Sequence, residues 1–124
     1  MPLCIAVVED ETPVLELLRD VLEIDGFSVL TFDRPDVAET HLQNNLRPDL
    51  FLIDIMLPGS TGIELAETLR QRGFAHTPMI AMSASKTMTL SAIQSGLFQE
   101  TLYKPFDLFD LLTCVSRYIV QQIA

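Results

Sequence analysis

The chain has 124 residues, of which 48% are hydrophobic and 20% charged, and this size and composition are typical of one domain with a substantial core. Its formal net charge of -9 argues against direct binding of nucleic acid or anionic lipid, because both partners require clustered lysine and arginine. No apolar run reaches the roughly 20 residues of a membrane-spanning helix, and the N-terminus lacks the features of a signal peptide, so we expect a cytoplasmic protein.

The first half of the chain alternates short apolar runs with segments of helical periodicity. The run from Leu3 to Val8 is apolar without alternation, which is typical of a strand covered on both faces. Thr12 and Pro13 then provide an N-cap and a first helical position, and Gly26 provides a stop. By the same reasoning we expect strands over 27–32 and 50–53 and helices over 35–44 and 62–72.

The second half continues this alternation with weaker patterns. Pro78 to Ser83 predicts a fourth strand, and Thr101 to Tyr103 predicts a brief fifth one. Between them, residues 84–96 are rich in Ser and Thr and have only a short apolar stripe, which predicts a short helix. Asp107 is placed to cap a last helix, whose inward residues are expected to be Leu108, Phe109, Leu112, Val115 and Ile119.

This succession of five β/α units predicts the fold class. Strands that alternate with helices form a parallel sheet with right-handed crossovers and with helices on both faces. We therefore expect a single α/β domain over residues 1–124, with a doubly wound five-stranded sheet. Ligands of such folds bind at the carboxyl ends of the strands, near the point where the strand order reverses.

Asp54 lies inside the most apolar run of the chain, LFLIDIMLPG. An ionised carboxylate that is buried there loses its hydration and needs a counter-charge or a metal ion. Asp54 therefore either marks the point where a buried strand meets water, or performs chemistry there.

Polar residues also stand at the carboxyl ends of the other strands: Glu9, Asp10 and Glu11 after the first, Ser83 at the end of the fourth, and Lys104 and Pro105 after the fifth. Carboxylates that are gathered so closely repel one another unless a cation is present, and Mg²⁺ prefers oxygen ligands of this kind. The cluster predicts a magnesium site.

Each of these residues also has an ordinary interpretation when it is taken alone. The acidic run at 9–11 fits a solvated turn that favours the start of a helix, Ser83 fits a capping hydroxyl, and a Lys-Pro pair fits a loop. Their coincidence at the strand ends of one predicted sheet favours a functional site.

Four motifs, VVEDE, LIDIMLPGSTG, MSAS and YKPF, occur in this order, and together they resemble the receiver domains of two-component response regulators over essentially the whole chain. The resemblance implies a CheY-like, flavodoxin-like sheet with strand order 2-1-3-4-5. It implies that Asp54 is the phosphoacceptor, with Ser83 and Lys104 holding the phosphoryl oxygens. It further implies that Mg²⁺ is bound by Asp10 directly, by Glu9 as an acidic neighbour through water, by Asp54, and by the backbone carbonyl of Met56. Pro105 would follow a cis peptide bond that aims the lysine inward.

The resemblance also implies a function and a set of partners. The domain would accept a phosphoryl group from a sensor histidine kinase or a histidine phosphotransfer protein in a Mg²⁺-dependent reaction. It would then act as a switch without turnover of a metabolite. Its output would be a downstream target or an attached output domain, with a dimer that forms on phosphorylation as a further expectation. Direct binding of nucleic acid or of a membrane by this chain is not expected.

The sequence departs from the family pattern near the fifth strand. Most receivers carry an aromatic residue three positions before the lysine, but here that position is Thr101. Thr101 and Tyr103 are expected to share one face of the strand. Either Tyr103 or Phe98 would then replace the usual aromatic switch, or the signal would depend on backbone rearrangement alone.

Two alternatives belong to other functional classes. A haloacid-dehalogenase-like hydrolase also forms an acyl phosphate on a strand-end aspartate, but it needs a second aspartate two positions later, where this chain has Met56. A pseudo-receiver that binds partners without phosphorylation would be expected to lack Asp10, Asp54 or Lys104, and all three are present.

Overall fold

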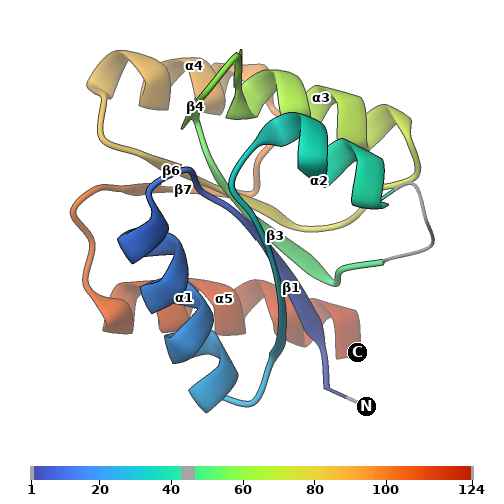
Figure 1. The fold of residues 1–124 in the computed structure, drawn as a ribbon, viewed down its shortest axis with the longest axis vertical. Coiled ribbons are helices and arrows are strands. Elements are labelled where there is room, and N and C mark those ends of the chain that lie inside the picture. The colour runs from blue at the N-terminus through green and yellow to red at the C-terminus, as the bar shows by residue number, and fades with distance from the viewer. Residues whose placement is uncertain (1, 43–46, 124) are drawn as a thin grey trace.

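The computed structural model describes residues 2–42 and 47–123 and has a parallel five-stranded sheet at its centre (Figure 1). The order of the strands is β2-β1-β3-β6-β7, and every neighbouring pair is parallel, so the predicted order 2-1-3-4-5 of the main strands is confirmed. The strands are β1 (Cys4–Val8), β2 (Ser28–Phe32), β3 (Leu50–Asp54), β6 (Met79–Ser83) and β7 (Glu100–Tyr103).

Helices cover both faces of this sheet, as Figure 1 shows, with α1 and α5 on one face and α2, α3 and α4 on the other. They are α1 (Thr12–Ile24), α2 (Pro35–Leu42), α3 (Gly62–Gln71), α4 (Lys86–Ser95) and α5 (Leu108–Ile123). None of the helices in the described part of the chain is long and apolar enough to span a membrane. The parallel sheet with helices on both faces confirms the predicted doubly wound α/β fold. Residues 43 and 44, which were expected to extend α2, lie outside the described residues.

Strand alternation divides the interior into two main cores. On β1, Ile5 and Val7 pack with residues of α1 and α5, whereas Ala6 and Val8 pack with residues of α2 and α3. All five residues of β3 are buried because this strand lies at the centre of the sheet. This explains its unbroken apolar run, since burying each large aliphatic side chain stabilises the fold by roughly 1.5–3 kcal/mol.

A short antiparallel hairpin follows β3. It consists of β4 (Met56–Leu57) and β5 (Ser60–Thr61). Gly59 stands at its tip with a φ of 76°, which favours glycine. The hairpin leads directly into α3, where the Thr61 hydroxyl caps the helix by accepting a hydrogen bond from the Glu64 amide at 3.1 Å.

Two details of the helix termini bear on the sequence expectations. The N-cap of α1 is Glu11, without a side-chain capping bond, and Thr12 is already helical, so the expected N-cap is wrong by one residue. Asp107 caps α5 as expected, since its Oδ1 accepts a hydrogen bond from the Asp110 amide at 2.7 Å.

The expected inward face of α5 is wrong at its first turn. Phe109 is 76% exposed and Leu108 is 39% exposed. The buried face instead includes Leu111, and Phe109 lies about 200° around the helix from it. Leu108 is on the buried side, but it borders a surface groove beside α1. Among the α5 side chains up to residue 119, which the structure describes, those of Leu111, Cys114, Val115 and Ile119 are buried.

The ion pair between Glu100 on β7 and Arg117 on α5 predicts a pH-dependent stability. Glu100 accepts hydrogen bonds from Arg117 and, at 3.0 Å, from the Tyr118 hydroxyl. Burial alone would raise the pKa of Glu100, but these bonds, together with one from Cys114, lower it below its ordinary value of 4.5. The stability that this carboxylate provides is complete above the unfolded-state pKa and is lost as the pH falls through the lower folded-state pKa.

We therefore expect the free energy of unfolding to fall less steeply below pH 4.5 in Glu100→Gln than in the wild type. Urea denaturation at a series of pH values measures this difference. Glu67→Gln, at an exposed position of α3, is the matched control and should keep the wild-type pH dependence. Equal acid sensitivity of Glu100→Gln and the wild type would contradict this role of the ion pair.

Candidate functional site

The carboxyl ends of β1, β3 and β7 bring Glu9, Asp54 and Lys104 into direct contact. The Lys104 Nζ donates to Asp54 Oδ2 at 2.7 Å and to Glu9 Oε2 at 2.8 Å. Glu9 is fully buried and Asp54 is 4% exposed, while the lysine side chain is 18% exposed. The ammonium group is therefore the counter-charge that a carboxylate needs inside the apolar run of β3.

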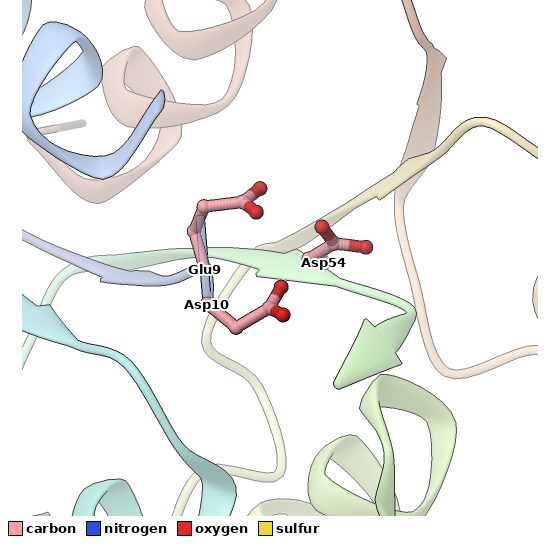
Figure 2. Close-up of side chains that lie close together, drawn as sticks. All are labelled: Glu9, Asp10 and Asp54. Carbon is pink, nitrogen blue, oxygen red and sulfur yellow. The ribbon is translucent and has the colours of Figure 1, made fainter. Parts of the chain in front are cut away.

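Asp10 adds a third carboxylate beside this ion pair. One carboxylate oxygen from each of Glu9, Asp10 and Asp54 lies within 4.8 Å of the others, and Figure 2 shows the three side chains gathered at the ends of β1 and β3. Asp10 is exposed, which opens the cluster to water. Hard oxygen donors beside water fit Mg²⁺, which takes few protein ligands and keeps several of its waters.

The two charged partners of Asp54 have shifted pKa values in the folded protein. Burial raises the pKa of Glu9 to about 7, and the nearby Asp54 adds to this rise, whereas the hydrogen bond from Lys104 opposes it. Burial alone would lower the pKa of Lys104, but its hydrogen bonds to Asp54 and Glu9 raise it. The lysine is therefore an ammonium at neutral pH.

Backbone amides hold the second oxygen of each buried carboxylate. Asp54 Oδ1 accepts from the Met56 amide at 2.9 Å, and Glu9 Oε1 accepts from the Glu11 amide at 3.2 Å. These bonds tie the strand ends to the loops that follow them, so both carboxylates are oriented before any ligand binds. The Met56 side chain is 56% exposed and does not fill the site.

Ser83 lies at the carboxyl end of β6 and is fully buried, but its hydroxyl is occupied by local bonds. Its Oγ donates to the Ser85 carbonyl at 3.1 Å and accepts from the Ser85 amide at 3.2 Å. No hydrogen bond joins this hydroxyl to Asp54 or Lys104 in the described part of the chain. Ser83 does contact Lys104 through the backbone, since the Lys104 amide donates to the Ser83 carbonyl at 2.7 Å.

The segment around β7 bears on the departure from the family pattern at Thr101. The peptide bond between Lys104 and Pro105 is cis, as expected. Thr101 is half-buried and Tyr103 is 45% exposed, so neither is enclosed in the core. Phe98 packs beside Ala81 and Ala92 and is the more buried aromatic candidate for a switch residue.

Sequence reasoning missed Ser85, which links Ser83 to the next helix. Besides holding the Ser83 hydroxyl, Ser85 is the N-cap of α4, because its Oγ accepts from the Met88 amide at 3.2 Å. The signal was present in the sequence, since serine is a preferred N-cap residue and Ser85 directly precedes the helical segment. It was overlooked because MSAS has two serines and only Ser83 stands at the end of the strand.

The fold and the site together define a receiver-type α/β domain, with acidic residues and a lysine at the carboxyl ends of its strands. The chain belongs to the response regulator receiver domain family, which its sequence matches over residues 5–116. This is the phosphoacceptor family of two-component signalling that the four motifs resemble. The match leaves the haloacid-dehalogenase-like hydrolase without support.

Individual relatives of known name support this family membership. The chain is 42% identical over 118 residues to the phosphate regulon transcriptional regulatory protein PhoB of Rhizobium meliloti, and the match covers 93% of this chain and 51% of that protein. It is 32% identical over 102 residues to the DNA-binding response regulator MtrA of Mycobacterium leprae, covering 82% of this chain and 44% of that protein. The chain therefore spans about half the length of these relatives.

A solved structure gives the same fold. The response regulator TrrA of Thermotoga maritima, in complex with Mg²⁺ and a beryllium fluoride, superposes with a TM-score of 0.83 and 27% identity, covering 94% of this chain and 98% of that one.

Proposed function

We propose that Asp54 accepts a phosphoryl group from a sensor histidine kinase or a histidine phosphotransfer protein, and that the acyl phosphate switches the binding of a partner. The observation that carries this proposal is the buried carboxylate of Asp54, which contacts the Lys104 ammonium and forms with Glu9 and Asp10 an acidic cluster that fits Mg²⁺. Family membership supports the same function, since receivers are phosphorylation-dependent switches.

The transfer forms one bond and breaks another. A carboxylate oxygen of Asp54 attacks phosphorus, the bond from phosphorus to the donor histidine nitrogen breaks, and that nitrogen keeps the electron pair. Phosphoryl transfer depends on positioning and charge stabilisation, so the main task of the site is to mask negative charge on both reactants. Lys104 already contacts Asp54 at 2.7 Å and is placed to bind a phosphoryl oxygen, and the Ser83 hydroxyl would bind another after it leaves Ser85.

The residues proposed to hold Mg²⁺ are Asp10 directly, Glu9 through water, Asp54, and the backbone carbonyl of Met56. When bound, the ion would supply positive charge that reduces repulsion between the carboxylate and the incoming phosphoryl group. Glu9 has a second task in this arrangement, because its Oε2 also holds the Lys104 ammonium at 2.8 Å.

Mg²⁺ is expected to stabilise the folded protein, because the three carboxylates are gathered only in the native state. At a free concentration about 100 times Kd, a ligand that binds only the folded state adds about 2.7 kcal/mol. Thermal denaturation with and without millimolar Mg²⁺ measures the effect. Asp10→Asn should lose most of the shift in Tm, whereas Asp25→Asn, at the exposed end of α1, should keep it. No shift in the wild type, or an equal shift in Asp10→Asn, would refute the metal site.

The proposal extends to the partners of the chain. Relatives that are about twice as long are named as a transcriptional regulatory protein and as a DNA-binding response regulator. We therefore propose that the output is a DNA-binding domain in the same polypeptide or a separate target, with this domain spanning residues 1–124. The net charge of -9 fits a signalling role without direct DNA contact. We further propose that the protein is cytoplasmic and that it forms a dimer on phosphorylation. It would act as a switch without turnover of a metabolite.

A further inference from the structure

Arg70, in the last turn of α3, makes an unusual set of contacts that the phosphoacceptor site does not explain. Its half-buried guanidinium group donates five hydrogen bonds to neutral oxygens from two separate loops. Nη1 reaches the carbonyls of Phe74, Ala75 and Thr77 at 2.9, 3.2 and 2.6 Å, and Nη2 reaches the Leu97 carbonyl at 2.5 Å and Gln99 Oε1 at 3.2 Å. The side chain therefore joins the loop before β6 to the loop after α4.

Gln99 extends this connection to the sheet. Its Oε1 accepts from the Met79 amide at 2.7 Å, and its own amide donates to the Met79 carbonyl at 2.9 Å. We call Arg70, Leu97 and Gln99 the Arg70 anchor. Because hydrogen bonds from a charged donor are stronger than neutral ones, the anchor fixes the C-terminal end of α4 to the first residue of β6.

The opposite end of α4 is held by two hydrogen bonds to Ser83, one of which the proposed reaction would break. Ser85, the N-cap of α4, keeps its position through its amide and carbonyl contacts with the Ser83 hydroxyl. A serine hydroxyl has one proton to donate. When Ser83 donates to a phosphoryl oxygen on Asp54, it cannot also donate to the Ser85 carbonyl, so the N-terminal end of α4 loses one of its two hydrogen bonds to Ser83 and is held more weakly.

Between its two ends, α4 is only lightly packed. Ala92 is the one buried residue among its ten residues, and Leu90 and Ile93 are 58% and 60% exposed. Few apolar contacts therefore resist a movement of the helix, and local openings of low free energy are expected in such segments. The end contacts determine how α4 can move.

We propose that the Arg70 anchor is the fixed end about which α4 moves when Asp54 is phosphorylated. The inference rests on the proposed function, because the loss of the bond at Ser85 begins with a phosphoryl group on Asp54. Arg70 touches neither the phosphoryl group nor the metal ligands and is a positioning residue. Its role is to confine the conformational change to the N-terminal part of α4 and to keep β7 in register with β6.

Amide hydrogen exchange measured residue by residue, with and without beryllofluoride and Mg²⁺ as a stable phosphoryl mimic, tests this inference. In the wild type, exchange should rise over 86–90 on addition of the mimic and should stay unchanged at Gln99. Arg70→Lys keeps the positive charge but cannot span five acceptors in two loops. In this variant the mimic should accelerate exchange at Gln99 by about tenfold, the equivalent of one lost charge-assisted hydrogen bond.

Arg72→Lys is the matched control, since Arg72 is exposed at the same end of α3 and its side chain donates no hydrogen bond within the described ranges. It should behave as the wild type. A purely structural Arg70 would raise exchange at Gln99 by the same factor with and without the mimic, and this result would overturn the inference. If Arg70→Lys does not fold, Gln99→Met removes the same link from the other side. In that variant the mimic should likewise accelerate amide exchange at position 99.

Labelling of Asp54 by acetyl phosphate, measured in parallel, distinguishes a failure of the Arg70 anchor from a failure of the proposed function. Normal labelling and a normal wild-type response, combined with an identical response in Arg70→Lys and Gln99→Met, would refute the anchor alone. A wild type that is neither labelled nor altered by the mimic would refute the proposed function, and the anchor with it.

Discussion

Gly62→Ala is expected to destabilise the fold by about 3 kcal/mol, the upper range for overpacking a well-packed interior. A Cβ atom at Gly62 would lie 2.3 Å from the Asp54 backbone oxygen and 2.9 Å from both Ile53 Cγ2 and Ile55 Cα. The first of these neighbours is backbone, so no side-chain rotation relieves the clash. The start of α3 would have to move away from the end of β3, and the loop that orients Asp54 would move with it.

Urea denaturation of the variant measures this loss, and Gly59→Ala is its matched control. Gly59 has a φ of 76°, and a Cβ atom there would have no other atom within 4 Å, so alanine carries only the backbone cost of about 1 kcal/mol. We expect Gly62→Ala to be clearly the less stable of the two and to bind Mg²⁺ more weakly. Equal stabilities would show that the close approach of α3 to β3 is not required.

Lys104→Met is expected to slow the labelling of Asp54 by acetyl phosphate by about 100-fold, which is the typical loss when one preorganised charge-stabilising donor is removed. The variant also leaves Glu9 and Asp54 facing each other without their ammonium partner. Their repulsion raises the cost of ionising both, so the stability of the variant should depend more strongly on Mg²⁺ than that of the wild type.

Labelling rates at saturating Mg²⁺ measure the first effect, and thermal denaturation measures the second. Lys86→Met removes the only other lysine of the chain, an exposed residue at the start of α4, and should be labelled at the wild-type rate. A Lys104→Met variant that is labelled as fast as Lys86→Met would show that the lysine does not assist the transfer.

The sequence was sufficient to predict the sheet and the location of the site because both follow from simple periodicities. The apolar run of β3 is typical of a strand at the centre of a parallel sheet, and the carboxyl ends of parallel strands meet at one edge. Glu9, Asp54 and Lys104 could therefore be placed together before their contacts were known. Their ion pairs at 2.7 and 2.8 Å confirm that they converge.

Features that depend on irregular backbone could not be predicted in the same way. The hairpin of β4 and β5 has two residues in each strand, too few to give an alternating pattern. In the sequence, Arg70 resembles an ordinary polar residue of α3. Most of its partners are backbone carbonyl groups in two loops, and the pattern of residue types does not indicate such contacts. The exposure of Phe109 was missed because an apolar residue in an amphipathic helix was assigned to the core without regard to its angle from Leu111.

The most direct test of the central claim is to locate the phosphoryl group after incubation with acetyl phosphate and Mg²⁺. Peptide mapping by mass spectrometry is predicted to find one label, on Asp54, that is stable in acid and lost in base, as an acyl phosphate is. Asp54→Asn should carry no label, while Asp25→Asn should be labelled as the wild type is. A label on Ser83 or on a histidine, or full labelling of Asp54→Asn, would contradict the account.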